Sequence, residues 1–181
     1  MKAPYQESQL YFTDEMRYGT RTHSRRRWTR QGHRPACPVK LGYEWGYLYV
    51  AICPFTGDMY AMFLSHLDKQ CFTYFLQQLQ LYLQQKGIDQ ALLMGDGATA
   101  HTAQHWPQQQ LLQWQKLPTA CPELNPVERF FEELRASTSN KVFADKQHVE
   151  DYLADLIRLH QQQPQLISSL TLFPYLSAVP T

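Results

Sequence analysis

Two apolar runs in this sequence each close on an acidic residue, and this pattern limits the folds open to the chain. Residues 9–15 predict a short buried strand that ends in Asp14 and Glu15, and residues 91–96 predict another that ends in Asp96. Buried carboxylates need hydrogen-bonding partners or a metal ion. Because sites in an open α/β sheet form where neighbouring strands end, we expect Asp14 and Asp96 to converge.

A third acid lies where a proline-punctuated loop turns into a helix. Asn125 is a good N-cap, and Pro126 suits the first helical position. Glu128 follows just off the apolar stripe, and two interpretations of it stay open. It forms a capping box with the N–H of Asn125, or it is a carboxylate held at a rigid helix start as a metal ligand. Glu132, one turn later, is an alternative ligand. The apolar stripe itself recurs at i, i+3, i+4 and i+7 and comprises Val127, Phe130, Phe131 and Leu134.

The remaining pattern alternates strands with amphipathic helices, which predicts an α/β fold with a mixed sheet flanked by helices. An antiparallel hairpin is expected at one side of the sheet, because turn residues separate its two strands. We expect one domain over residues 1–161 and a loosely ordered tail over 162–181. The further predicted elements are strands at 46–53, 58–64 and 111–116, helices at 68–86 and 145–160, and a helix-like piece at 102–110.

Positive charge is concentrated at the front of the chain. Residues 1–40 carry nine basic and three acidic residues, a net charge of +6, so the rest of the chain sums to −5. Such a surface is suited to contact phosphate groups; alternatively, these arginines form a solvated loop or pair with the acids of the body. The arginines assigned to nucleic-acid binding are Arg17, Arg21, Arg25, Arg26, Arg27, Arg30 and Arg34.

Length and composition indicate a folded, cytoplasmic protein. The chain has 181 residues, 44% of them hydrophobic, and no apolar run approaches the length of a membrane span. We expect no membrane association. The four cysteines show no zinc-type spacing and are expected to stay reduced. Pairing of Cys121 with His101 as nucleophile and base is a minor alternative.

The three acids together favour a particular cofactor. Three carboxylates without thiolates suit Mg²⁺ or Mn²⁺ better than zinc. Two such ions would activate a water molecule and stabilise a leaving oxygen in phosphodiester cleavage.

The residues around these acids resemble the signature blocks of the IS630/Tc1/mariner superfamily of transposases. The resemblance covers nearly the whole chain, and the block that contains Glu128 is its most specific part. One departure is Gly97, where many relatives carry Asn. The matching segments are Phe12-Thr13-Asp14-Glu15, Met94-Gly95-Asp96-Gly97-Ala98 with His101, Pro122-Glu123-Leu124-Asn125-Pro126-Val127-Glu128, and residues 28–35.

This resemblance implies a DDE catalytic domain with a ribonuclease-H-like fold. Asp14, Asp96 and Glu128 would be its catalytic, metal-binding residues, and His101 would orient a ligand or touch a phosphate. The implied chemistry is nicking at element ends, followed by attack of the freed 3′-OH on target DNA. DNA is therefore the implied partner, and transposases of this kind often act as dimers on paired ends.

Relatives also carry a helix-turn-helix DNA-binding domain before the first catalytic strand, for which this sequence has no room. We therefore expect either a partner segment encoded separately or joined by frameshifting, or a truncated remnant. Two other functions stay open: a non-catalytic DNA-binding or regulatory remnant, and a ribonuclease-H-like nuclease acting on RNA or branched DNA.

Overall fold

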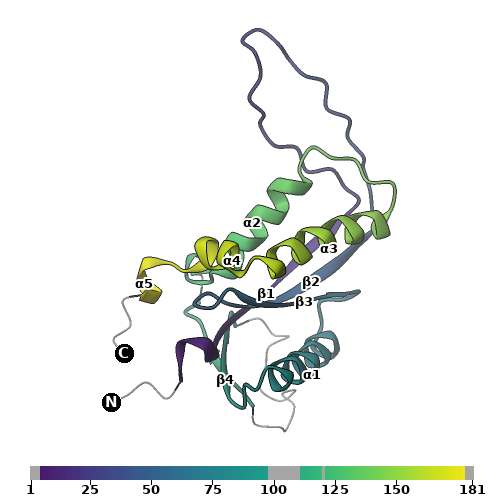
Figure 1. Cartoon of the computed structure of the whole chain (residues 1–181). Coiled ribbons are helices and arrows are strands. Elements are labelled where there is room, and N and C mark those ends of the chain that lie inside the picture. The colour runs from purple at the N-terminus through teal and green to yellow at the C-terminus, as the bar shows by residue number, and fades with distance from the viewer. Residues whose placement is uncertain (1–4, 98–110, 120, 178–181) are drawn as a thin grey trace.

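Five strands form one mixed sheet in the computed structural model, which describes residues 5–97, 111–119 and 121–177 (Figure 1). The order across the sheet is β3-β2-β1-β4-β5. β1, β2 and β3 pair antiparallel, whereas β4 pairs parallel with both β1 and β5. The predicted mixed α/β sheet is therefore confirmed. The strands are β1 (Leu10–Gly19), β2 (Trp45–Cys53), β3 (Asp58–Leu64), β4 (Ala91–Gly95) and β5 (Leu112–Lys116).

Helices cover both faces of this sheet (Figure 1). α1 packs on one face through buried residues such as Phe75 and Leu79, which join Tyr11 and Tyr49 of the sheet. α2, α3 and α4 cover the other face, where Phe130 and Leu153 meet Phe12 and Val50 from the sheet. The helices are α1 (Lys69–Gln85), α2 (Val127–Thr138), α3 (Lys146–Gln162), α4 (Pro164–Thr171) and α5 (Pro174–Ser177), with short 3₁₀ turns at Glu7–Gln9 and Pro122–Leu124.

Local signals in the sequence set several of these boundaries. The side chain of Asp68 caps α1 by accepting a hydrogen bond from the N–H of Cys71 at 2.8 Å. Gly87 follows the helix with φ of +72°, a left-handed conformation that glycine adopts at little cost. Gly57, with φ of +70°, closes the turn between β2 and β3, so the predicted hairpin forms as expected.

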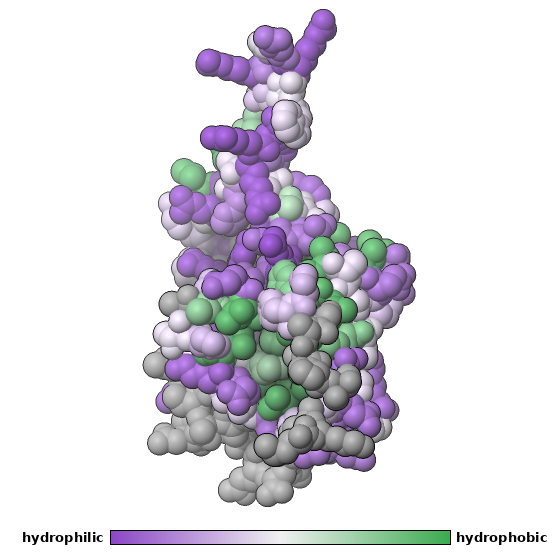
Figure 2. Space-filling model, turned by 90° about the vertical axis from the view of Figure 1, so that its left-hand side faces the viewer, coloured by the Kyte–Doolittle hydropathy of each residue, from purple (hydrophilic) through white to green (hydrophobic). Residues whose placement is uncertain are grey.

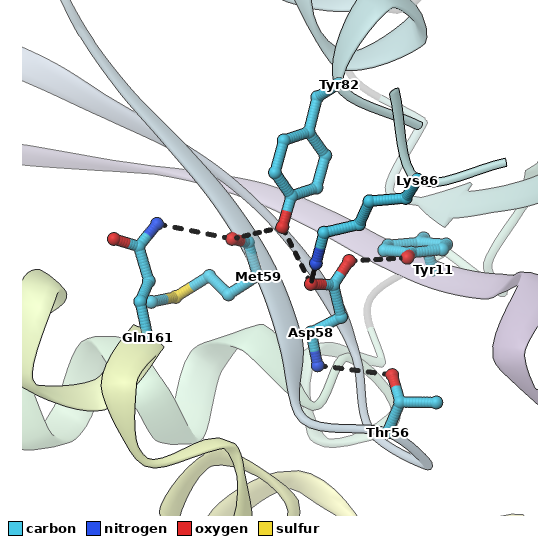
Figure 3. Close-up of polar contacts among 7 residues, drawn as sticks. All are labelled: Tyr11, Thr56, Asp58, Met59, Tyr82, Lys86 and Gln161. Atoms are coloured by element: carbon cyan, nitrogen blue, oxygen red, sulfur yellow. Dashed lines mark hydrogen bonds and ion pairs between the residues drawn. The ribbon is translucent and has the colours of Figure 1, made fainter. Parts of the chain in front are cut away.

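A partly buried polar cluster ties α1 to the sheet (Figure 3). Asp58, at the start of β3, accepts hydrogen bonds of 2.7 Å from the hydroxyl groups of both Tyr11 and Tyr82. Lys86, just after α1, forms an ion pair with the same carboxylate. Burial, with the Asp58 carboxylate next, raises the pKa of Tyr11 above its ordinary range. These contacts join β1, β3 and the end of α1.

β1 is longer than the sequence predicts. The expected strand ends at Glu15, but β1 continues to Gly19 because β2 pairs with it through Gly19↔Trp45. Asp14 therefore lies inside a strand, opposite Val50, and does not close it. The parallel pairing with β4 is shorter and ends at Phe12↔Met94.

Residues 20–44, here called the arm, project from the sheet between β1 and β2 (Figure 1). Its two legs are joined at the base, where the N–H groups of Thr20 and Thr22 donate to the carbonyl oxygens of Glu44 and Lys40 at 3.0 Å. Most of its side chains are exposed, and hydrophilic ones gather along it (Figure 2). From residue 20 onward the arginine-rich region is therefore an exposed loop outside the core, whereas Arg17 belongs to β1.

The region after residue 161 differs from the expected loosely ordered tail. α4 packs against α2 and α3, and the side chains of Ile167 and Thr171 are fully buried. The expectation is therefore wrong for residues 164–171, because their apolar face completes the core above β3. In the described parts of the chain, no helix combines the length and apolarity required to cross a membrane. The helix-like piece predicted over 102–110 lies outside the described residues.

Candidate active site

Asp14 is placed by the pleat of β1. Alternate residues of a strand face opposite sides of a sheet, so Asp14 shares its face with Phe12 and Met16 and points toward α2. The parallel register with β4 ends at Phe12↔Met94. Two residues further along each strand come Asp14 and Asp96. The convergence of these acids thus follows from the register, although only β4 has ended at that point.

Glu128 reaches the same site from the first turn of α2. The turn is fixed by Asn125, whose side-chain oxygen accepts a hydrogen bond from the N–H of Val127 at 3.2 Å. Asn125 thus caps the helix as predicted, while the helix itself begins at Val127. The capping-box interpretation of Glu128 is wrong: its carboxylate accepts a hydrogen bond from Arg135 at 3.2 Å, and the N–H of Asn125 donates to Pro122.

Asn125 also connects the helix start directly to the first acid. Its side chain is only 4% exposed, and its amide nitrogen donates to the carbonyl oxygen of Thr13 at 3.1 Å and to Oδ2 of Asp14 at 3.2 Å. The backbone N–H of Glu15 donates to the other oxygen of Asp14 at 2.8 Å. One buried amide therefore fixes both the orientation of Asp14 and the start of the helix that carries Glu128.

The turn after β4 brings Asp96 to the site and places Gly97 against Lys116. A β-carbon on Gly97 would lie 2.0 Å from Cε and 2.4 Å from Nζ of Lys116, the last residue of β5. The Lys116 side chain occupies the space that any larger residue at position 97 would need. Because these atoms are the far end of a flexible, exposed side chain, a larger residue at position 97 would displace the Lys116 side chain.

The three acids line one pocket of about 290 Å³, here called the acid pocket. Among its described lining residues Lys116 is the one basic side chain. Across the described chain, only His66, Asp68 and Cys71 bring three potential metal-donor atoms within 4.8 Å of one another. The acids therefore surround a space without meeting at one point. The other residues that line the acid pocket are Gly97, Leu117, Pro118, Thr119, Cys121, Pro122 and Asn125.

The acid pocket concentrates negative charge around a partly buried carboxyl group. Burial raises the pKa of Asp14 from 3.8 to about 7, and repulsion from Glu15, Glu128 and Asp96 adds to this shift. The hydrogen bond from the N–H of Glu15 acts in the opposite direction. Without a metal ion, the Asp14 carboxyl group therefore holds its proton more tightly than an ordinary aspartate does, and a bound cation would favour its charged form.

Other predicted residues lie elsewhere. His101 is outside the described residues, which leaves its role and its pairing with Cys121 as predictions. Glu132 is exposed, forms an ion pair with Arg129 at 3.1 Å, and does not line the acid pocket. Arg17 lies on β1, with its guanidinium group 4.4 Å from the centre of the Trp45 ring. The other arginines assigned to nucleic-acid binding lie on the arm, and all are exposed: Arg21, Arg25, Arg26, Arg27, Arg30 and Arg34.

Sequence reasoning missed three contributors to this site. Lys116 could have been found, because it ends the strand predicted beside Asp96. The contact of Asn125 with Asp14 joins residues 111 positions apart, and no local pattern predicts it. The ion pair of Arg135 with Glu128 spans seven positions, which is two turns of helix and outside the i+3 and i+4 spacings normally searched.

Comparison with known proteins agrees with this arrangement. The family model of the DDE superfamily endonucleases matches residues 9–150, which contain all three acids. The chain belongs to this family. A comparison with curated protein sequences finds no match.

Solved structures of the Mos1 mariner transposase share the fold. Its paired-end complexes with Mn and with Mg have TM-scores of 0.65 and 0.62 at 18% and 15% identity, and cover 91% of this chain. Its isolated catalytic domain has a TM-score of 0.60 at 14% identity and 91% coverage. These likenesses confirm the predicted ribonuclease-H-like fold. This DDE superfamily chain spans 54% and 53% of the transposase chains in the complexes, and 79% of the isolated domain.

Proposed function

We propose that this chain is the catalytic domain of an IS630-type transposase, which cleaves DNA strands at element ends and transfers them to a target. The observation that carries the proposal is that Asp14, Asp96 and Glu128, from three separate parts of the chain, line one pocket. Family membership supports a nuclease or transposase activity in general. The proposed substrate and the transfer step go beyond that membership.

The donor atoms of the acid pocket suit a hard divalent cation. Carboxylate oxygens are the ligands that Mg²⁺ and Mn²⁺ prefer. The pKa of Asp14 is raised by burial first and then by the neighbouring carboxylates, and a bound cation would oppose both effects. Asp14, Asp96 and Glu128 would hold the metal, and we propose two ions. Bound there, such ions supply an activated water or hydroxyl nucleophile and stabilise the leaving oxygen.

The residues of the chain have separate parts in this proposal. Asn125 orients Asp14 by donating to one carboxylate oxygen, which leaves that oxygen's second lone pair available. Lys116 would contact a non-bridging oxygen of the DNA phosphate, because its ammonium group lies beside Gly97 at the rim of the pocket. Arg135 contacts one oxygen of the Glu128 carboxylate and would compete with a metal ion for it, while the other oxygen stays available as a ligand.

The test combines metal binding with strand cleavage. We expect Mn²⁺ to raise the melting temperature of the wild type by several degrees and to support nicking of supercoiled plasmid, and Asp96→Asn to lose both effects. Glu132→Gln is the matched control, because it removes a carboxylate outside the acid pocket. Nicking that persists in Asp96→Asn would refute the catalytic assignment.

The same experiment separates the alternatives. Salt-sensitive DNA binding without any metal-dependent nicking would favour the non-catalytic remnant. Preferential cleavage of RNA–DNA hybrids or branched DNA over plain duplex would favour the ribonuclease-H-like nuclease.

A further inference from the structure

A second cleft lies on the same face of β1 as Asp14, further toward the arm. It has a volume of about 260 Å³ and is bounded by the end of β1, the first leg of the arm and the end of α2. Met16 and Tyr18, which follow Asp14 at every second position, lie along its floor. We call it the basic cleft, because its lining includes Arg21, His23, Arg25, Arg135 and Lys141. Arg17 also borders it, but its guanidinium group lies over the Trp45 ring on the other face of β1.

The charge of this cleft is unbalanced. None of its described lining residues is acidic, and Arg21 and Arg25 have no carboxylate partner within the described chain. Glu150 of α3 does not line the cleft; it accepts a hydrogen bond at 2.5 Å from Tyr18, which does, and pairs with Lys146. The carbonyl end of α2 contributes only about half a negative charge. Several full positive charges therefore face this cleft without an equivalent counter-charge.

The two walls of the cleft are fastened to each other by Asn140, in the loop after α2. Its backbone has φ of +59°, and its N–H donates to the carbonyl oxygen of His23 at 2.9 Å. Its side chain accepts from the N–H of Arg25 at 3.0 Å and donates to the carbonyl oxygen of Arg25 at 3.1 Å. Thr22 of the arm also donates to the carbonyl oxygen of Lys141 at 3.2 Å. The arginines at the base of the arm are thus held opposite the end of α2.

Arg135 connects the basic cleft to the acid pocket. Its side chain lines the cleft, and its guanidinium group pairs at 3.2 Å with Glu128, which lines the acid pocket. Asp14 and Tyr18 are four residues apart on one strand, so the acid pocket and the cleft are neighbours along β1. A polyanion bound at the acid pocket and extending along β1 would therefore contact the cations of the basic cleft.

We propose that the basic cleft is a binding site for the phosphate backbone of the DNA strand that enters the acid pocket. This assignment rests on the proposed function, because it takes DNA as the ligand. It assigns DNA contacts to Arg135 and Lys141, outside the arginines at the front of the sequence. It also separates Arg21 and Arg25, which line the cleft, from Arg26, Arg30 and Arg34, which do not.

The test measures DNA binding without cleavage. Fluorescence anisotropy with a labelled DNA duplex, in EDTA and across a range of NaCl concentrations, gives the slope of log K against log salt. The variant Arg25→Gln/Lys141→Gln removes one cation from each wall. The control Lys69→Gln/Arg158→Gln removes the same charge from α1 and α3, away from the cleft. We expect the slope of the cleft variant to become about two units shallower, and that of the control to stay unchanged.

Equal slopes for the two variants would overturn the proposal, because the cleft would then contribute no more than any other surface charge. Lys141 also contacts Tyr152, so each variant is first melted without DNA. If the first variant fails to fold, Arg21→Gln/Arg25→Gln replaces it, since those side chains are exposed. Binding in EDTA does not require the acids to be catalytic. Failure of the nicking test with Asp96→Asn therefore refutes the proposed function alone. An unchanged salt slope for the cleft variant refutes only the assignment of DNA binding to the basic cleft.

Discussion

Replacement of Asp14 by Asn should make the protein more stable than the wild type at high pH. The gain in the free energy of unfolding should grow as the pH rises. Burial raises the pKa of Asp14 to about 7 in the folded protein, against an ordinary value of 3.8. The folded state therefore holds this proton more tightly than the unfolded state does. The resulting stabilisation is fully present below the unfolded pKa and is lost as the pH rises through the folded pKa.

The magnitude follows from these two pKa values. Between about pH 5 and about pH 8, the Asp14 carboxyl group should lower the free energy of unfolding of the wild type by about 2.5 kcal/mol. Asn does not titrate, so Asp14→Asn removes this pH-dependent loss. The variant also places an amide N–H₂ group against the amide of Asn125, at a cost of about 1 kcal/mol. That cost does not depend on pH and cancels when two pH values are compared.

The assay is urea unfolding of both proteins at the two pH values, with EDTA to remove metal ions. We expect the stability of Asp14→Asn relative to the wild type to increase by about 2.5 kcal/mol from the lower to the higher pH. Asp89→Asn, which makes the same substitution at an exposed aspartate outside the acid pocket, is the control. A difference for Asp14→Asn that changes with pH no more than that of the control would refute the reasoning, because burial would then not oppose the charge.

Two further predictions concern the acid pocket and the core. Arg135→Gln should bind Mn²⁺ about two- to fivefold more tightly by calorimetry, because an exposed ion pair of up to about 1 kcal/mol no longer competes for Glu128; weaker binding would show that Arg135 supports the metal site instead. Ile167→Ala should lower the free energy of unfolding by about 2–4 kcal/mol in the same urea assay, whereas Leu166→Ala, at an exposed neighbouring position, should cost far less.

The sequence by itself determined the local structure of this protein. The hairpin of β2 and β3, the capped helix α1 and the capped start of α2 rest on turn glycines, a capping Asp68 or Asn125, and apolar periodicity. These signals act over a few residues, so they are legible without the rest of the chain. The positions of Asp96 just after a strand and of Glu128 in the first turn of a helix were legible for the same reason, whereas Asp14 lies inside β1 and not at its end.

The tertiary structure decided how these pieces meet. β1 extends to Gly19 because β2 supplies its hydrogen bonds, and α4 is ordered because Ile167 completes a core built by other elements. Asn125 contacts Asp14 only once α2 has packed on the sheet, and the basic cleft exists only where the arm lies against the end of α2. The contacts of Asn125 with Asp14 and of the arm with Asn140 join residues more than a hundred positions apart. The free energy of all these contacts comes from burial and pairing between segments, which no single segment contains.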